Sequence, residues 1–269
     1  MNARLLIIDP QNDFCDIPGA ALPVPGANAD MLRLADFMKQ ARGKLTDIAV
    51  TLDSHASVGI ERTTFWNAAN GQPVAPFTQI AESDVRAGHF SPRDMQRLPE
   101  VLAYLAALER GGRYKLIVWP VHCVLGTWGH NIHEAVAKEL TGWEQATQHT
   151  AFRVLKGLNP MTEQYSAVQA EVPDERDPGT LANHALIDQA RPDGGLLLVA
   201  GEAASHCVAS TLEHLFGVLD TGERRRVVIL SDCMSPVGSF EAQATKFFAD
   251  ARALGARVMT SSAALAELA

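Results

Sequence analysis

The sequence lacks any apolar run approaching the roughly 20 residues that a membrane-spanning helix needs. It also lacks a block of basic residues: 23 lysines and arginines stand against 31 acidic residues, and the net charge is −8 at pH 7. Internal repeats and low-complexity segments are absent as well. A charge balance of this kind argues against nucleic acid or an anionic membrane as the main partner. We therefore expect a small-molecule partner, with no nucleic acid and no membrane.

Cysteine is scarce, with four residues at Cys15, Cys123, Cys207 and Cys233. No two of them are separated by two residues, so the spacing excludes a zinc knuckle and a CxxC redox pair. Reduced cysteines in a cytoplasmic protein are the natural interpretation. The first residues lead straight into a strand-like run, so we also expect no signal peptide.

Short apolar runs alternate with amphipathic helical patterns along most of the 269 residues. This alternation predicts an α/β fold: a doubly wound, mostly parallel central sheet with helices on both faces. We expect one domain, residues 1–269, with a strand at 115–118 and a short helix around 161–170. Residues from about 60 to 112 show little periodicity before 98–108. We interpret them as an insertion, a long loop followed by a helix, that could act as a lid or an oligomer contact.

One junction between a strand and a helix stands out. The aliphatic run Leu196–Ala200 predicts a buried strand, and helical spacing resumes at Val208. Cys207 is therefore expected in the first turn of a helix, where free N–H groups and the helix dipole lower the pKa of a thiol. The residue could be a nucleophile or a small buried residue that packs the junction. This stretch alone favours packing.

Other chemically active residues follow other predicted strands, namely Asp9, Asp53, His55, His122 and Lys156. Because the carboxyl ends of parallel strands share one edge of the sheet, these side chains can converge. Asp53 and His55 point to the same side of an extended segment, and with His122 they form a three-ligand set typical of catalytic metal sites. Taken singly, Asp9 could cap a turn, Asp53 and His55 could be a hydrogen-bonded pair, and Lys156 could be a solvated turn charge.

Several further residues have more ordinary interpretations. His130 and His133 could be rival metal ligands, but a helix surface or an outer shell suits them better. His89 is expected at the surface, and Cys123 and Cys233 are expected to pack.

Five motifs lie at these strand ends: IIDPQNDFC (7–15), LDSH (52–55), WPVHCVLGTWG (119–129), LKG (155–157) and GEAASHCV (201–208). In this order they resemble the isochorismatase-like cysteine hydrolases, and among them the nicotinamidases. The matches span both ends of the chain and omit the insertion. Two departures from the family pattern concern the substrate more than the hydrolase chemistry: Ser54 stands where tryptophan is frequent, and Glu202 where a small or apolar residue is common.

The resemblance implies four groups of site residues and a cis peptide bond between Glu202 and Ala203. The groups are the catalytic Asp9, Lys156 and Cys207; the metal ligands Asp53, His55 and His122; the oxyanion-hole N–H groups of Ala203 and Cys207; and the substrate-pocket residues Phe14, Trp119, Glu202 and His206. The implied cofactor is one divalent ion, with zinc ahead of manganese or iron.

The resemblance also implies an activity. The chain would be a metal-containing amidase that hydrolyses nicotinamide, or a related heteroaromatic amide, to the acid and ammonia through a thioester on Cys207. The alternative is a cysteine hydrolase of the same fold that acts on another small amide, a ureide or an N-carbamoyl compound. A non-catalytic metal- or ligand-binding protein on this scaffold is the third possibility. A homo-oligomer is common in the family and is expected here.

Overall fold

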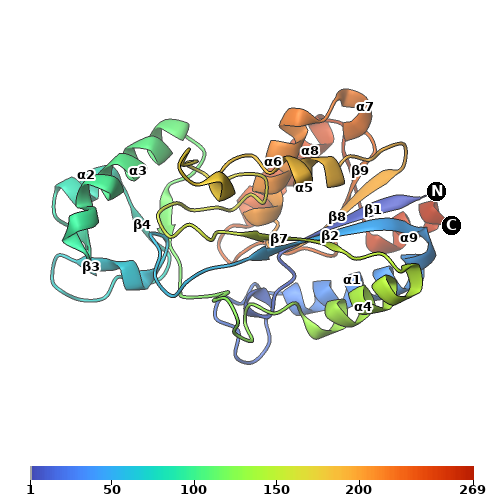
Figure 1. Ribbon diagram of the computed structural model, residues 1–269, viewed down its shortest axis with the longest axis horizontal. Coiled ribbons are helices and arrows are strands. Elements are labelled where there is room, and N and C mark those ends of the chain that lie inside the picture. Colours follow the sequence, from blue (N-terminus) through green and yellow to red (C-terminus); the bar gives the residue numbers. More distant parts are fainter. Residues whose placement is uncertain (1) are drawn as a thin grey trace.

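A parallel sheet forms the centre of the computed structural model, which describes residues 2–269 (Figure 1). Every neighbouring pair of its six strands is parallel. From one edge to the other, the strands are β10 (Arg257–Met259), β9 (Val227–Leu230), β8 (Leu196–Gly201), β1 (Ala3–Ile8), β2 (Leu45–Asp53) and β7 (Phe152–Lys156).

Helices cover both faces of this sheet (Figure 1). One face carries α1 (Ala27–Ala41), α4 (Glu134–Thr147) and α9 (Ser261–Leu268), and the other carries α5 (His184–Gln189), α6 (Cys207–Val218) and α8 (Glu241–Ala253), with the short α7 (Thr221–Arg224) beyond α6. The doubly wound α/β fold expected from the sequence is confirmed. No helix within residues 2–269 combines the length and the apolar character that crossing a membrane requires.

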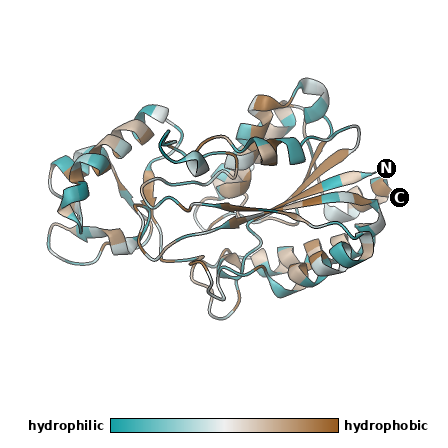
Figure 2. Cartoon of the chain, viewed as in Figure 1, coloured by the Kyte–Doolittle hydropathy of each residue, from teal (hydrophilic) through white to brown (hydrophobic). Residues whose placement is uncertain are grey.

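The central strands are apolar on both faces because helices cover both faces. The strand β8 reads LLLVAG, and each of its residues is buried. Colouring by hydropathy shows the same contrast, with brown central strands between helices of mixed character (Figure 2). Parallel strands all end at the same edge of the sheet, so the residues that follow β1, β2, β7 and β8 are brought together there.

Residues 60–112 form a small lobe with its own core, and the expectation of a long loop followed by a helix is wrong in its first part. The helix is present as α3 (Leu98–Gly111), but the chain before it is structured. It contains 3-10 turns at Thr63–Phe65 and Met95–Arg97, the strands β3 (Trp66–Ala68), β4 (Thr78–Ile80) and β5 (Phe90–Pro92), and the helix α2 (Glu82–Arg86). A separate apolar cluster that includes Trp66 and Leu105 fills this lobe, which projects from the end of the sheet opposite the two termini (Figure 1).

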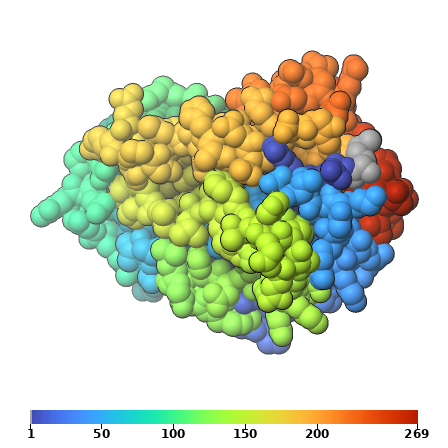
Figure 3. Space-filling view, turned by 45° about the vertical axis from the view of Figure 1, so that its right-hand side comes forward, coloured from blue at the N-terminus to red at the C-terminus, as the bar shows by residue number. Residues whose placement is uncertain are grey.

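Two other expectations are corrected by the structure. The segment at 115–118 forms β6 (Leu116–Val118), which pairs antiparallel with β4 of the lobe and lies outside the central sheet. Every residue from 161 to 170 is described, and none is helical. This segment instead packs on α3, where the Glu163 N–H donates to the Tyr104 hydroxyl at 3.1 Å. The space-filling view shows the yellow chain after β7 lying against the green lobe (Figure 3).

Candidate active site

Three side chains from separate elements meet at the carboxyl edge of the sheet. Asp9 follows β1, Lys156 ends β7, and Cys207 begins α6. The Lys156 Nζ atom lies 3.0 Å from Asp9 Oδ2 and 3.6 Å from Cys207 Sγ. All three side chains are buried. The structure thus gathers one acid, one ammonium group and one thiol that lie far apart in the sequence.

Lys156 is a fixed positive charge between two carboxylates. Its Nζ atom also donates to Asp53 Oδ1 at 2.8 Å and to the Gln164 carbonyl at 3.1 Å. Burial opposes the charge, yet Asp53 and Asp9 hold the pKa of Lys156 well above its usual range. The alternative of a solvated turn charge is therefore excluded by burial and by these contacts.

The two carboxyl oxygens of Asp9 have different partners. The Thr51 hydroxyl donates to Asp9 Oδ1 at 2.5 Å and accepts from the Asp9 N–H at 3.1 Å. Within residues 2–269 no well-directed hydrogen bond reaches Asp9 Oδ2, so its contact with Lys156 is mainly electrostatic. Burial raises the pKa of Asp9, Lys156 opposes the rise and Asp53 adds to it. Asp9 is therefore a carboxylate that can accept a proton at Oδ2.

Cys207 differs in one respect from the sequence expectation. Its place in the first turn of α6 is as expected, but its pKa is raised well above the usual range. Burial is the main cause, and the negative charges of Asp9 and Asp53 add to it while Lys156 opposes it. The thiol consequently keeps its proton in the resting site, and a thiolate forms only when a base such as Asp9 removes that proton.

The turn between β8 and Cys207 leaves two backbone donors free. The peptide bond between Glu202 and Ala203 is cis, as the family resemblance implied. Gly201 has φ +121°, and a Cβ atom there would lie 1.9 Å from the Ile8 carbonyl oxygen, so only glycine fits. Among the described residues, no acceptor pairs with the N–H of Ala203 or of Cys207. Two unpaired N–H groups beside a nucleophile can stabilise an oxyanion.

A second cluster adjoins the first through Asp53. Its Oδ2 atom lies 2.7 Å from His55 Nε2 and 3.3 Å from His122 Nε2, while Oδ1 contacts Lys156. Burial lowers the pKa of His122 to about 4, so this imidazole is neutral. Burial also opposes a charge on His55, but Asp53 raises the pKa of His55 to about 9. One carboxylate oxygen and two imidazole nitrogens therefore converge in a buried site.

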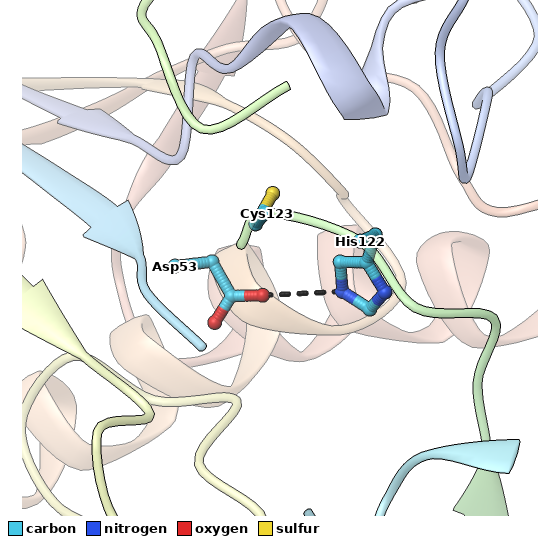
Figure 4. Close-up of side chains that lie close together, drawn as sticks. All are labelled: Asp53, His122 and Cys123. Carbon is cyan, nitrogen blue, oxygen red and sulfur yellow. Dashed lines mark hydrogen bonds and ion pairs between the residues drawn. The ribbon is translucent and has the colours of Figure 1, made fainter. Parts of the chain in front are cut away.

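Cys123 lies at the edge of this cluster. Single ligand atoms of Asp53, His122 and Cys123 lie within 4.8 Å of one another. Figure 4 shows the Cys123 sulfur pointing away from the contact between Asp53 and His122. Burial raises the pKa of the Cys123 thiol well above its usual range, which disfavours the thiolate that binds metals. We therefore rank His55, whose Nε2 atom contacts Asp53 directly, above Cys123 as the third ligand.

The lobe contributes two charged residues that the sequence did not indicate. Glu61 Oε1 lies 3.3 Å from His55 Nδ1 and 3.0 Å from Arg62 Nε. Arg62 is fully buried, and its Nη1 atom donates to the Pro120 carbonyl at 3.0 Å and lies 2.5 Å from His122 Nδ1. Both residues therefore hold the outer side of the two histidines. No periodicity marks them, because they lie in irregular chain at the base of the lobe.

A cavity opens onto both clusters. About 420 Å³ of space, part of it open to solvent, lies among its lining residues, and Lys156, Cys207 and the residues of the second cluster form one part of its wall. Phe14, Trp119 and His206 line it, as the resemblance implied. The rings of Trp119 and His206 meet edge to face at 5.3 Å between centroids. Aromatic rings and the Cys207 thiol thus line the same cavity.

Comparison with known proteins relates this arrangement to characterised enzymes. No protein-family model matches the sequence. The nicotinamidase of Saccharomyces cerevisiae is 28% identical over 163 residues, which cover 61% of this chain and 60% of that protein. The aligned region therefore spans less than two thirds of the relative.

The likeness in three dimensions extends over nearly the whole chain. The solved yeast nicotinamidase has a TM-score of 0.65 at 22% identity and covers 96% of this chain and 99% of its own; a second structure of it, with the same values, holds the inhibitor nicotinaldehyde. An isochorismatase family protein from Desulfovibrio vulgaris has a TM-score of 0.54 at 18% identity, with 99% and 98% covered. The fold is that of the isochorismatase-like hydrolases. A pyrazinamidase from Pyrococcus horikoshii, solved in complex with zinc, has a TM-score of 0.52 at 20% identity, with 97% and 99% covered.

Within this isochorismatase-like fold, the expected pocket role of Glu202 is wrong. Its side chain is fully buried but is absent from the cavity wall. The Glu202 Oε2 atom accepts from the Ser235 N–H at 3.1 Å, on the side of the turn that faces α1. The turn places Ala203 against the cavity, whereas the preceding side chain points to the opposite side.

Glu163 is a cavity residue that the sequence did not indicate. Its Oε2 atom accepts from the Trp119 indole N–H at 3.1 Å, and its Oε1 atom accepts from the Gln164 N–H at 2.9 Å. Burial, reinforced by Glu61, raises the pKa of Glu163 to about 7. The wall around Trp119 therefore carries an acid that changes its charge near neutral pH.

Three other histidines, at positions 89, 130 and 133, lie outside the second cluster. His130 Nε2 contacts the Ser54 hydroxyl at 2.8 Å, directly behind the Asp53–His55 segment. His133 caps α4 through its ring nitrogen, and His89 is exposed. His130 thus supports the segment that carries Asp53 and His55, His133 has a structural role at the start of α4, and His89 lies at the surface as expected.

Proposed function

We propose that the protein is an amidase that hydrolyses nicotinamide, or a related heteroaromatic amide, to the carboxylic acid and ammonia. The observation that carries this proposal is the position of Lys156 Nζ, 3.0 Å from Asp9 and 3.6 Å from Cys207 Sγ, at the end of an aromatic cavity. The sequence likeness to a nicotinamidase supports the same substrate class. The structure of that enzyme with nicotinaldehyde supports a cavity of this kind for a heteroaromatic carbonyl compound.

Acylation begins with a proton transfer from Cys207 to Asp9. The Oδ2 atom of Asp9 accepts the thiol proton, and Lys156 stabilises the thiolate that remains. The sulfur attacks the amide carbonyl, and the N–H groups of Ala203 and Cys207 hold the oxyanion. As the C–N bond breaks, the protonated Asp9 returns its proton to the departing nitrogen, which leaves as ammonia.

Deacylation reverses these roles with water. Asp9, again a carboxylate, removes a proton from a water molecule that attacks the thioester carbonyl. The same two N–H groups stabilise the second oxyanion. The C–S bond then breaks, the acid leaves, and the proton on Asp9 returns to the sulfur of Cys207. The burial that raises the pKa of Asp9 suits this role, because the group must gain and lose a proton in each half-reaction.

The second cluster fits a divalent metal ion. Ligand atoms about 2.1 Å from one ion lie roughly 3 Å apart, and Asp53 Oδ2 lies 2.7 Å from His55 Nε2 and 3.3 Å from His122 Nε2. The ligand atoms that all lie within 4.8 Å of one another are those of Asp53, His122 and Cys123, so binding by His55 requires its ring to move away from its contact with Asp53.

His122 Nδ1 lies 2.8 Å from the Pro120 carbonyl and 2.5 Å from Arg62 Nη1, so these two groups fix the ring from its outer side while Nε2 faces Asp53. The donor set suits zinc, manganese or iron, and we propose zinc first, as in the pyrazinamidase from Pyrococcus horikoshii. When bound, the ion would orient and polarise the substrate's ring nitrogen.

The aromatic residues orient the substrate ring. Phe14 and His122 meet at 5.3 Å between ring centroids, and Trp119 also lines the cavity. Burial lowers the pKa of His206 to about 4, so this imidazole is neutral and can act as an aromatic wall. A flat heteroaromatic ring therefore finds apolar faces on its sides and the thiol at its end.

Glu163 favours a second class of substrate. A buried carboxyl group in the cavity wall can pair with additional N–H groups of a ureide or an N-carbamoyl compound. Such a compound would use the same thiol chemistry. Release of ammonia from nicotinamide, compared with release from simple ureides and N-carbamoyl amino acids, separates the two substrate classes.

We also propose a setting for the enzyme. Residues 1–269 act as one catalytic domain, in which the lobe at about 60–112 forms a lid or an oligomer contact. All four cysteines are free, which suits the cytoplasm. We further propose that the enzyme is a homo-oligomer. Size-exclusion chromatography with light scattering tests the oligomer.

Replacement of Cys207 tests the proposed function. Cys207→Ala should lower the rate of ammonia release from nicotinamide by about a thousandfold or more, because no other group can form the thioester. Cys233→Ala is the control, since Cys233 is also buried but lies outside the cavity wall. Circular dichroism checks the fold of both variants. Substantial turnover by a folded Cys207→Ala protein would end the proposal.

A further inference from the structure

A buried carboxyl group lies on the reverse side of the turn that carries the free N–H groups. Glu202 is fully buried, and no N–H or O–H group within residues 2–269 pairs with its Oε1 atom. Its acidic neighbour is Asp30, on α1, and Ser235 links the two side chains by donating its N–H to Glu202 Oε2 at 3.1 Å and its hydroxyl to Asp30 Oδ2 at 2.5 Å. Two carboxylates cannot form a hydrogen bond with each other unless one of them carries a proton. Two buried carboxyl groups that bind the same serine are therefore stable beside each other only when one of them carries a proton.

The surroundings decide which carboxyl group carries the proton. Asp30 is engaged on both oxygens, by the Arg33 guanidinium on Oδ1 and by the Ser235 hydroxyl at 2.5 Å on Oδ2. Among residues 2–269, no cation forms an ion pair with Glu202, and its side chain accepts one neutral hydrogen bond, from the Ser235 N–H. Burial, together with the charges of Asp30 and Asp16, raises the pKa of Glu202 well above its usual range. The proton therefore resides on Glu202.

The remaining neighbours of Glu202 do not change this assignment. Cys15 contributes a buried thiol, and burial raises its pKa to about 12, so it stays neutral. Asp16 lies on the connection before α1 and is committed to two backbone N–H groups, of Gly26 and Asn28. Arg33 is the cation in this region, and it pairs with Asp30. No neighbour on these elements offers Glu202 a positive charge of its own.

This pair is connected to the turn at several points. Ser235 donates its N–H to Glu202 and accepts from the Ala204 N–H at 2.9 Å through its carbonyl. The Glu202 N–H donates to the Ile8 carbonyl at 2.8 Å. The residues on either side of Ala203 are therefore fixed by hydrogen bonds, while the Ala203 N–H itself remains free to face the cavity.

We propose that Glu202 is a positioning residue whose protonated carboxyl group, hydrogen-bonded to Asp30, fixes the turn that presents the Ala203 N–H to the substrate. The assignment rests on the proposed function as far as this N–H serves an oxyanion. Glu202 does not touch the substrate. Its removal should therefore change kcat more than KM, since an oxyanion donor acts in the transition state.

Three variants test the proposal. Glu202→Ala removes both hydrogen bonds of the side chain, whereas Glu202→Gln keeps one donor and one acceptor without a titrating group. Asp30→Asn removes the charge that keeps the proton on Glu202. Glu175→Gln, at an exposed position outside this region, controls for the loss of a carboxyl group.

The kinetic result expected is a fall of about tenfold or more in kcat for Glu202→Ala, with little change in KM, and recovery of most of that loss in Glu202→Gln. An unchanged kcat in a folded Glu202→Ala protein would refute the positioning role. So would a loss that appears only in KM, because the residue would then act in substrate binding.

Stability gives a readout that does not depend on the substrate. A carboxyl group whose pKa is raised by folding makes the folded state lose stability as the pH rises from the unfolded pKa towards the folded one. Urea unfolding should therefore show wild type losing stability from pH 5 to pH 8 relative to Glu202→Gln, whereas Asp30→Asn should keep part of this loss, because burial still raises the pKa of Glu202. An infrared difference spectrum between wild type and Glu202→Gln at pH 8 should contain a protonated carboxyl band.

These outcomes separate the two proposals. Parallel stability profiles in wild type and Glu202→Gln, without a carboxyl band, would refute the shared proton whatever the enzyme hydrolyses. Wild type could instead fail to release ammonia from nicotinamide and still show the pH-dependent loss of stability and the protonated carboxyl band. In that case the proposed substrate would be wrong, and the acid–carboxylate pair would be supported.

Discussion

At the scale of single residues, the site places two carboxyl groups and one thiol around one ammonium. Lys156 contacts both Asp9 and Asp53, but Asp53 also faces His55 at 2.7 Å. Although burial opposes it, His55 and Lys156 hold the pKa of Asp53 well below its usual range, whereas burial raises the pKa of Asp9. A proton released by Cys207 is therefore taken up by Asp9, and Asp53 remains an anion.

Thr51 adjusts the pKa of Asp9, which gives a testable pH dependence. Its hydroxyl donates to Asp9 Oδ1 and so favours the carboxylate. Thr51→Val removes this hydrogen bond, and the pKa of Asp9 should rise. Because Asp9 must be deprotonated to accept the thiol proton, the acid limb of the kcat/KM profile should move to higher pH. The profile for nicotinamide hydrolysis measures the shift.

A residue on the same strand serves as a control for this prediction. Thr46 lies on β2 as well, and its hydroxyl contacts the Ala3 carbonyl, far from Asp9 along the strand. Thr46→Val should leave the acid limb in place. If Thr51→Val leaves the limb where it is, or moves it to lower pH, the role of Asp9 as the base is contradicted.

The residue scale also shows how far the sequence predicts this site. Thr51 and Asp53 lie two residues apart on β2, so their side chains point to the same side of the strand. The pattern that indicated Asp53 could therefore have indicated Thr51 too. Glu61 and Glu163 are different, because they reach the site from irregular segments whose path depends on packing against the lobe. The direction of Glu202 was mispredicted because the side to which a side chain points within a tight turn does not follow from its position in the sequence.

At the scale of elements, the sequence predicts long elements better than short ones. The strand β8 and the helix α1 are long enough for their apolar periodicity to be recognised. The strands β3, β4 and β5 have three residues each and show no period. The chain at 161–170 has apolar residues that mimic a helix, but Met161 packs on the cluster of the lobe whereas Tyr165, Ala167 and Val168 pack in the core of the central sheet. Tertiary contacts determine the secondary structure of such short segments.

The turn after β7 yields a prediction about metal binding. Gly157 has φ +78°, and a Cβ atom there would lie 2.6 Å from His55 Cε1. Gly157→Ala should displace the His55 ring and lower the metal content of the purified protein, as measured by inductively coupled plasma mass spectrometry. The left-handed conformation itself costs about 1–2 kcal/mol with alanine, whatever the neighbours.

Gly88 separates the clash from the backbone strain. It has φ +76°, close to that of Gly157, but no atom lies within 4 Å of the Cβ position. Gly88→Ala should therefore lose a similar amount of stability and keep its metal. Equal metal content in the two variants would contradict the proposed role of His55 as a ligand.

At the scale of the whole molecule, the site joins two separately packed bodies. The sheet provides Asp53 and His55, the segment after β6 provides His122, and the base of the lobe provides Glu61 and Arg62. The lobe has its own apolar cluster, and its contacts with the catalytic edge include the polar ones of Glu61 and Arg62. An ion bound to this cluster would therefore hold the sheet and the base of the lobe together.

Metal removal should consequently lower the thermal stability of the whole protein. A ligand present at a hundred times its dissociation constant stabilises the folded state by about 2.7 kcal/mol, and a loss of that size lowers Tm by several degrees in a chain of this length. Differential scanning calorimetry with and without a chelator measures the shift. Asp53→Asn is the matched variant, because it removes the carboxylate that both histidines face. Its Tm should not respond to the chelator, and an equal response in both proteins would place the metal elsewhere.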